Sequence, residues 1–358
     1  MKKFYSLVLL TMMMVASKSF AQGSLLATLS HDGNISAYYG AEALKSALAE
    51  ADNGDIITLS SGQFNAGNIT KNVVIRGAGM SLSTDSLNSH EATLIQNNFT
   101  ISLADTLDNH LIMEGLYFKG DITYSGTIKN AQFMKCRFKN FIASSSGTPL
   151  LNNATFIHCR FYNGFSIKAS SSAYFINCAV CGPSTSSFTG NLEFDNCFVK
   201  WDLSSSFGDT CDDVVNALYK NCILQYAGSM NYASYIPSSC VAYNCVGVWE
   251  SSDSMFSTMI SSNTTNKMVT GSNISTLFKS YTTTGRASYI QDEYVFELTD
   301  EAAAKYLGLD GTQVGLYGGN LVYDENPTIP QITKCNVAAK STADGKLSVD
   351  IEVKAAEY

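Results

Sequence analysis

The sequence has little positive charge, and its only long apolar run lies at the N-terminus. Lysine and arginine together number 23 against 31 aspartates and glutamates, and only four residues are arginine. An acidic chain argues against nucleic acid as a partner and against polyanionic ligands held by bulk charge alone. No later apolar run is long enough to cross a bilayer, so we expect no membrane span.

The first 21 residues resemble a secretory signal. Two lysines precede an apolar run over residues 7–16, and the small residues Ser19 and Ala21 follow it. The run is too short to span a bilayer, so we predict a cleaved signal peptide over residues 1–21. A buried N-terminal helix is the alternative. Export would place the protein in the periplasm, at the cell surface or outside the cell, and cleavage would lower the formal charge from −8 to −11 by removing three lysines.

Cysteine recurs at a nearly fixed interval through the middle of the chain. Six cysteines follow one another at intervals of 23, 19, 19, 25 and 23 residues, at Cys136, Cys159, Cys178, Cys197, Cys222 and Cys245. Around each one, small or aromatic residues alternate with mostly polar ones, and the alternation then resumes with its phase shifted by one residue. A period of two predicts β-strands, and the shift places a single turn residue between two strands that both face inward.

The residue at each phase shift is mostly of a type that tolerates left-handed backbone geometry. The eight positions are Gly77, Gly115, Lys135, His158, Asn177, Asn196, Asn221 and Asn244. Glycine and asparagine enter this geometry at the lowest cost. We therefore expect only Lys135 and His158 to need support from tertiary contacts.

The length of the repeat decides how its copies can pair. A unit of about 19 to 25 residues is too short for a strand and a helical crossover, so parallel copies must coil. We predict an all-β, single-stranded right-handed parallel β-helix, in which like residues stack about 4.8 Å apart. The interior should hold a column of small residues, the cysteine column, and an aromatic column formed by Phe133, Phe156, Phe175, Phe194 and Tyr219.

We expect the six cysteines to remain free thiols, even in an oxidising compartment. Stacked cysteines are close enough for a disulfide, but their parallel Cα–Cβ directions give poor torsion angles. Cys181, Cys211 and Cys335 lie outside the pattern, and the sequence does not indicate whether they pair.

The two ends of the predicted β-helix, which spans residues 22–325, need covers. Residues 39–51 have helical spacing of apolar residues and should form an N-terminal cap before a first strand over residues 55–59. Residues 250–280 predict longer and less regular coils. The tail, residues 326–358, contains two strand-like pieces joined by Asp344 and Gly345, which favours a β-hairpin.

Several segments of the chain resemble those of a known superfamily. Residues 54–64 after the predicted helix, the Val-Val-Ile-Arg-Gly-Ala-Gly segment at 73–79 and the Asn-Cys turns resemble secreted bacterial proteins of the pectin/pectate-lyase-like β-helix superfamily. The segment Gly315-Leu-Tyr-Gly-Gly319 is similar to the C-terminal region of exported β-helix proteins of that group. The resemblance implies the fold for nearly the whole mature chain. It also implies where to look for activity, since lyases of the superfamily use calcium held by carboxylates and hydrolases use clustered aspartates.

Three groups of residues are candidates for a site. Asp209, Asp212 and Asp213 form a tight acidic group whose oxygens could hold Ca²⁺, with a solvated acidic loop as the alternative. Arg137 and Arg160 should stack on the outside of one sheet beside His158, as a small basic patch for an acidic glycan or as a scattered solvated face. Trp201, Tyr226 and Trp249 each follow a repeat cysteine by four residues and should stack. They could form a platform for sugar rings, but the even offset from an inward cysteine favours inward packing.

One outward column is apolar, at Phe198, Ile223 and Val246. A patch of this kind is rarely left uncovered on a monomer, so we expect the segment after Glu250 to fold back over it.

These patterns support two hypotheses about function. The first is an exported β-helix that binds a polysaccharide or a cell-surface component without catalysis, as a monomer. The alternative is a polysaccharide lyase or glycoside hydrolase acting on acidic polysaccharide at the Asp209–Asp213 segment. A purely structural surface protein is a third interpretation.

Overall fold

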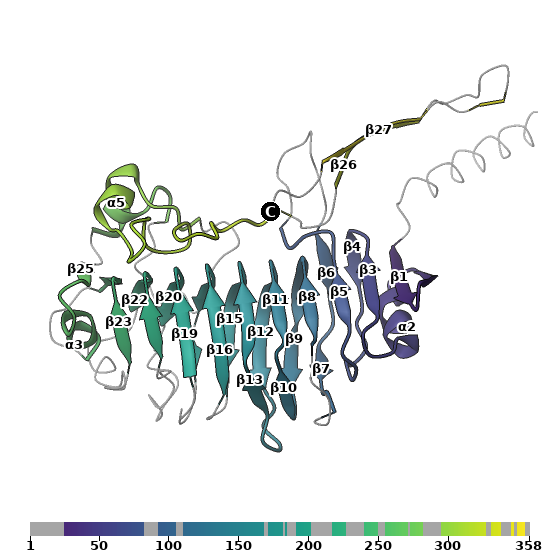
Figure 1. Ribbon diagram of the computed structural model, residues 1–358, viewed down its shortest axis with the longest axis horizontal. Coiled ribbons are helices and arrows are strands. Elements are labelled where there is room, and N and C mark those ends of the chain that lie inside the picture. The colour runs from purple at the N-terminus through teal and green to yellow at the C-terminus, as the bar shows by residue number, and fades with distance from the viewer. Residues whose placement is uncertain are drawn as a thin grey trace, which may run out of the picture.

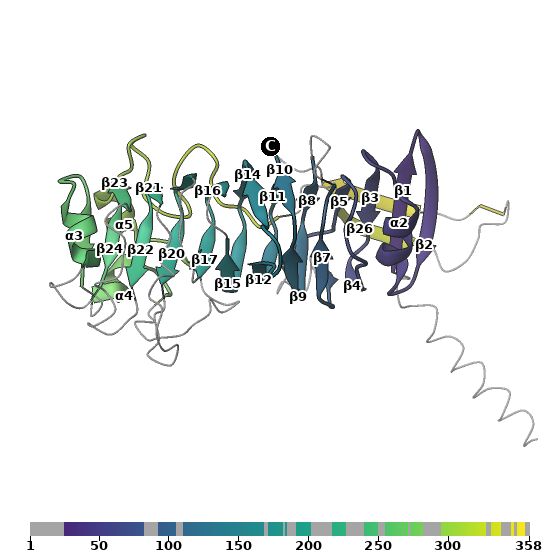
Figure 2. The ribbon, with the colours of Figure 1, turned by 90° about the horizontal axis from the view of Figure 1, so that it is seen from below.

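Stacked parallel coils form a β-solenoid, and short strands follow one another along its length (Figures 1 and 2). The computed structural model describes residues 25–81, 92–104, 110–167, 171–181, 183–184, 191–201, 217–226, 240–249, 255–270, 273–281, 295–326, 331–337, 345–346 and 349–354. No helix in these segments is long and apolar enough to cross a membrane.

Two long sheets form the sides of the solenoid, and a short two-stranded sheet, β10 (Thr127–Lys129) and β13 (Leu150–Asn152), adds to them. Sheet A has the strand order β2 (Asn34–Tyr39), β1 (Leu26–His31), β3 (Ile56–Leu59), β5 (Val74–Arg76), β8 (Ile112–Glu114), β11 (Gln132–Met134), β14 (Ala154–Ile157), β16 (Ser172–Ile176), β19 (Asn191–Asp195), β21 (Leu218–Lys220) and β23 (Val241–Tyr243). Sheet B has the order β25 (Lys267–Val269), β24 (Val246–Val248), β22 (Ile223–Tyr226), β20 (Phe198–Trp201), β17 (Ala179–Cys181), β15 (Arg160–Ser166), β12 (Arg137–Ala143), β9 (Leu116–Tyr124), β6 (Thr93–Ile95) and β4 (Gly62–Phe64), with β7 (Phe99–Ile101) beside β9 and β18 (Pro183–Ser184) beside β15.

The register of the strands places like residues on like, as the repeat predicts. Phe133 pairs with Phe156, and Phe156 with Phe175. Their rings stack at centroid distances of 4.8 Å, and Phe175 stacks on Phe194 at 4.5 Å. A second aromatic column, formed by Phe118, Phe138 and Phe161 of sheet B, meets the first edge to face. A third stack, Tyr124, Phe141 and Phe165, also meets the first column edge to face. The core therefore contains interlocked aromatic columns, of which the sequence predicted one.

The column of six cysteines lies in the same interior, and none of the six is in a disulfide. Each thiol donates to carbonyl oxygens of the surrounding coils, as Cys178 Sγ does to Phe156 O at 3.3 Å. The Sγ atoms of the last four cysteines also accept a hydrogen bond from the backbone N–H of the cysteine in the preceding coil, as in the 3.3 Å contact from Cys159 N to Cys178 Sγ. Burial raises the pKa of Cys136 to about 12, so this thiol stays protonated at neutral pH. The prediction of free thiols in this column is confirmed.

The turns at the phase shifts have the expected left-handed backbone at seven of eight positions. The φ angles of Lys135, His158 and Asn196 are 49°, 53° and 51°. Gly77 is the exception, because its φ is not in the left-handed range. A Cβ at this position would lie 2.4 Å from Gly115 O, so a close backbone approach requires the glycine.

The N-terminal end is covered by more than the predicted helix. Helix α2 (Ala43–Glu50) packs Ala43, Leu44 and Ala47 against the core. Before it, β1 and β2 form a hairpin through Asp32 and Gly33, both with positive φ, and β1 pairs antiparallel with β3. The prediction that the first strand is at residues 55–59 is therefore wrong, because the Asp-Gly turn and the alternation over residues 26–31 define earlier strands.

The segment after Glu250 covers the apolar outer face of sheet B, as predicted. It contains α3 (Met255–Ser261), α4 (Ile274–Leu277) and α5 (Asp300–Lys305). Phe198, Ile223 and Val246 are at most 1 % exposed and form a second apolar cluster with residues of this segment, such as Phe296. Phe198 and Phe296 stack at 4.0 Å.

Residues 306–326, here called the strap, run back from α5 along the column of turn residues (Figure 1). The contacts occur in reverse order of the solenoid and join Gly315 to Asn221, Leu316 to Asn177, Leu321 to His158 and Asp324 to Lys135. Lys135 Nζ donates to Asp324 Oδ2 at 2.8 Å, and His158 Nε2 lies 3.2 Å from Leu321 O. The two turn residues expected to need tertiary support thus receive it from the strap.

The end of the strap is held by buried charge. Arg160, whose side chain is 5 % exposed, lies 3.1 Å from Glu325 Oε1. Burial raises the pKa of Glu325, but the Arg160 charge and hydrogen bonds from Ser81 and Tyr323 outweigh it and lower that pKa below its usual value. Burial also raises the pKa of Asp324, but the hydrogen bond and charge of Lys135 outweigh this effect, so the pKa of Asp324 is lower than usual.

After the strap, β26 (Gln331–Val337) and β27 (Val349–Lys354) pair antiparallel, which confirms the predicted hairpin. Figure 1 shows this hairpin set apart from the stacked coils.

We expect at least six thiols to react with a disulfide reagent when the protein is denatured without reductant, and the six column thiols to be unreactive in the native protein. Their burial keeps the reagent away from all six sulfurs, and Cys136 is in addition held in its unreactive protonated form. Thiol titration with a chromogenic disulfide measures this directly. Fewer than six reactive thiols after denaturation would contradict the geometry of the column.

We expect Glu325→Gln to lower the free energy of unfolding at pH 7 by about 2 kcal/mol, because the buried Arg160 side chain loses its charged partner. A carboxyl group with a lowered folded-state pKa stabilises the protein above its unfolded-state pKa, near 4.5, and this stabilisation is lost as the pH falls through the folded-state value. The difference between wild type and variant should therefore shrink below about pH 4.5. Thermal unfolding at several pH values measures it. Asp32→Asn, at a side chain that is 88 % exposed, is the control. A difference that is independent of pH would contradict the ion pair.

Candidate binding pocket

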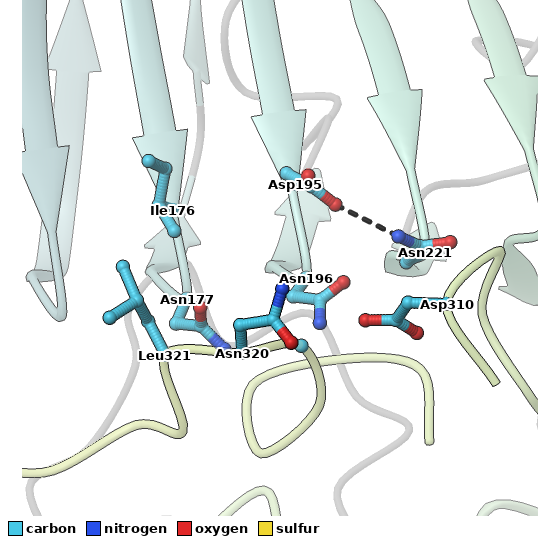
Figure 3. Close-up of a pocket in the computed structure, with 9 residues that line it drawn as sticks. Ile176, Asn177, Asp195, Asn196, Asn221, Asp310, Asn320 and Leu321 are labelled. Carbon is cyan, nitrogen blue, oxygen red and sulfur yellow. Dashed lines mark hydrogen bonds between the residues drawn. The ribbon is translucent and has the colours of Figure 1, made fainter. Parts of the chain in front are cut away.

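A polar pocket of about 200 Å³ lies between the strap and the turns of sheet A. The wall on the solenoid side comes from the ends of β16 and β19 and from three turn asparagines, and the wall on the strap side comes from two short loops. The lining residues are Ile176, Asn177, Asp195, Asn196, Asn221, Asp310, Gly319, Asn320 and Leu321. Figure 3 shows their side chains gathered around the space between strand ends and strap.

Asn196 is the pocket residue whose hydrogen bonding is incomplete. It is 3 % exposed, and neither its Nδ2 nor its Oδ1 has a hydrogen-bond partner among the described residues. The other two turn asparagines are satisfied: Asn177 Nδ2 donates to Leu316 O at 2.7 Å, and Asn221 Oδ1 accepts from Leu309 N at 2.8 Å. A buried amide left without partners costs about 1–3 kcal/mol per group, so a ligand that supplied a donor and an acceptor would recover this energy.

Two carboxylates face the same space. Asp195, at the end of β19, accepts from Asn221 Nδ2 at 3.0 Å. Asp310, in the strap, accepts from Thr312 N at 3.0 Å and Thr312 Oγ1 at 2.8 Å. In Figure 3 the Asp195 carboxylate is turned toward Asn221, and the Asp310 carboxylate faces the Asn196 amide.

The pKa of Asp195 is raised. Burial is the main cause, and the negative charges of Glu193 and Asp310 add to it, whereas the hydrogen bond from Asn221 and the charge of Lys220 act in the opposite direction. Lys220 is itself paired with Glu193. Asp195 is thus a carboxyl group whose proton is held more tightly than usual, at the edge of a cavity.

Two glycines of the strap let it lie directly on the asparagine turns. Gly319 has φ of 77°, and its amide donates to Thr312 Oγ1 at 2.7 Å. A Cβ on Gly319 would lie 2.4 Å from Asn196 Nδ2, and one on Gly318 would lie 2.9 Å from the same atom. The Gly-Gly pair therefore sets how closely the strap covers Asn196.

The predicted basic patch is stacked but not exposed. Arg137 pairs with Arg160 in register, yet each is 4 % exposed, and His158 is 7 % exposed. Arg137 lies between the rings of Tyr117 and Tyr162, at 5.1 and 4.8 Å from their centroids. The expectation of an open basic surface is wrong, because the strap places its own carboxylates on Arg160 and Lys135. Burial also lowers the pKa of His158, which favours the neutral ring.

Two members of the aromatic group, Tyr226 and Trp249, face inward, as the offset from the cysteines favoured. Tyr226 and Trp249 are 3 % and 4 % exposed, belong to the main core, and meet edge to face at 5.8 Å. Trp201 pairs with Tyr226 in register. Tyr226 and Trp249 thus form no open platform for sugar rings.

The acidic group Asp209, Asp212 and Asp213 lies outside the described residues, as does Cys211, and its role as a calcium site stays a prediction. Within the described segments, no three histidine, cysteine, aspartate or glutamate side chains are close enough together to hold a metal ion.

The pocket residues were not singled out as a site from the sequence. Asn196 and Asn221 were recognised as turn residues, but their part in a cavity depends on a strap more than 80 residues later in the chain. The available signal was the Gly318-Gly319 pair, since two adjacent glycines commonly mark a close backbone approach.

The protein is a β-solenoid in which the strap, residues 306–326, covers the column of turn residues. The chain matches no protein-family model, no curated protein and no solved structure.

We expect Gly319→Ala to destabilise the protein by about 2–3 kcal/mol, because the new Cβ would meet Asn196 and alanine is strained at positive φ. Gly311→Ala is the matched control. Its φ is 80°, but nothing lies within 4 Å of the added Cβ, so it should carry only the backbone penalty of about 1 kcal/mol. Urea unfolding of both variants measures the difference. Equal losses would show that the strap does not lie as close to Asn196 as described.

Proposed function

We propose that this protein is an exported, non-catalytic binding protein that holds a hydroxyl-rich ligand, the end of a glycan chain, in the pocket beneath the strap. The observation that carries the proposal is the Asn196 amide, which is buried beside the pocket with a free donor and a free acceptor. A sugar hydroxyl both donates and accepts a hydrogen bond, so hydroxyl groups match this amide better than a purely apolar or purely accepting ligand.

The size and position of the pocket support a small ligand unit. Its volume of about 200 Å³ is below the roughly 300–1,000 Å³ typical of sites for drug-sized molecules, which favours a single sugar at a chain end. Rigid strands and stacked turns hold the solenoid side of the pocket. A preformed site of this kind loses little conformational entropy when it binds.

Membership of the pectin/pectate-lyase-like superfamily is part of the proposal. The two parallel sheets, the asparagine turns and the segments at residues 54–64 and 73–79 support it. Export is proposed from the pattern of residues 1–21.

Glycoside hydrolysis is the second candidate. The raised pKa of Asp195 favours it, since a general acid needs a carboxyl group that holds its proton more tightly than usual, and Asp310 is a second carboxyl group in the same pocket. Release of reducing sugar that is lost in Asp195→Asn would favour this candidate over binding alone.

We expect the mature protein to bind members of a glycan panel and Asn196→Gly to bind the same glycans at least tenfold more weakly. Glycine tolerates the left-handed turn, where φ is 51°, so the substitution removes the amide without straining the backbone. Glycan-array screening followed by calorimetric titration measures the affinity.

Asn153→Gly is the matched control for this test. Asn153 has φ of 59° and lies in a different turn column, where it donates to Asn130 Oδ1 at 2.8 Å. The control should bind as the wild type does. Equal affinity in wild type and Asn196→Gly would show that the pocket is not the glycan-binding site. Absence of binding to any glycan would overturn the proposed function itself.

A further inference from the structure

The charge of the pocket limits the kind of ligand unit it can take. Its lining includes the carboxylates of Asp195 and Asp310, and no lysine, arginine or histidine is among the lining residues that the structure describes. The nearby ammonium group of Lys220 is engaged by Glu193. A uronate or another acidic sugar would therefore bring a third negative charge to a site without a free cation, at a high electrostatic cost.

Both carboxylates already accept hydrogen bonds, but each has acceptor capacity left. A carboxylate offers about four lone-pair directions. Asp195 is described with one donor, Asn221 Nδ2, and Asp310 with the two donors of Thr312. The ligand that best fills the remaining acceptor positions of the two carboxylates supplies several hydrogen-bond donors and a positive charge.

A bare metal ion fits less well than an organic cation. A metal ion could coordinate carboxylate oxygens and Asn196 Oδ1, but it would leave Asn196 Nδ2 buried without an acceptor. An ammonium group next to a hydroxyl group supplies donors to the carboxylates and both a donor and an acceptor to the amide. The unsatisfied atoms of Asn196 thus discriminate between the two kinds of cation.

We propose that the pocket recognises a sugar unit with a free amino group, in which the ammonium lies against Asp195 and Asp310 and a neighbouring hydroxyl pairs with the Asn196 amide. The proposal rests on the proposed glycan-binding function and names its ligand class. It replaces the acidic polysaccharide of the sequence-based alternative with a cationic one, because the basic residues that would have met acidic groups, Arg137, Arg160 and His158, are buried.

The test is a calorimetric titration of the full mature chain at pH 7 with four probes: glucosamine, glucose, N-acetylglucosamine and glucuronate. We expect glucosamine to bind at least tenfold more tightly than glucose, and the other two no better than glucose. Acetylation removes the charge while keeping the sugar ring, so N-acetylglucosamine isolates the contribution of the ammonium group.

Asp310→Asn provides the matched variant. It removes one charge but keeps an oxygen that accepts from Thr312, and it should reduce glucosamine binding about tenfold and glucose binding by a clearly smaller factor. Asp32→Asn, an exposed position in the N-terminal hairpin, should leave all four affinities as they are. Calcium chloride is titrated in parallel, and calcium binding that is lost in Asp310→Asn and competes with glucosamine would overturn the amine assignment.

The remaining outcomes separate this inference from the function it rests on. Equal binding of glucose and glucosamine, unaffected by Asp310→Asn, overturns the amine preference and leaves glycan binding intact. If no sugar binds, the protein is titrated with ethanolamine. Binding of ethanolamine that depends on Asp310 supports recognition of an amine without a glycan, whereas no binding overturns both proposals.

Discussion

The structure depends on one backbone constraint, a single left-handed residue between two strands that both face the interior. Because each turn consists of one residue, successive coils remain in register, and aromatic side chains stack at 4.5 to 5.1 Å along the core column from Phe133 to Tyr219. The cysteines beside these turns are free thiols, and their Sγ atoms form hydrogen bonds to backbone groups of neighbouring coils. Insertion or deletion of one residue in such a turn would move the apolar side chains of the following strand to the other face of the sheet.

The same turns create the surface on which the strap lies. The left-handed asparagines place their carboxamide groups in a row along the turns. The strap forms hydrogen bonds with those of Asn177 and Asn221, but the carboxamide of Asn196 has no partner among the described residues. The strap is held at its end by partly buried ion pairs with Lys135 and Arg160, and near the pocket by the close approach of Gly318 and Gly319. The pocket is therefore a by-product of how a long peptide segment fits a repeating column whose members differ.

Much of the fold could be predicted because the repeat is periodic. The phase of alternation places Phe156 and Cys178 inside, and the outward apolar column at Phe198, Ile223 and Val246 correctly indicated that a later segment covers it. The exposure of Arg137, Arg160 and His158 could not be predicted in the same way. Their outward direction follows from local periodicity. The burial of His158 and Arg160, however, involves Leu321 and Glu325, which lie about 165 positions later in the chain, and Arg137 packs between Tyr117 and Tyr162.

The sequence by itself determined the parallel coils, the interior columns and the left-handed turns, because each depends on residues within one or two repeats. Only the tertiary structure decided which outward residues remain accessible and where a cavity forms. The reason is that the strap has no period of its own. Its position is set by individual contacts with distant turn residues, and such contacts leave no mark in the local pattern of either segment.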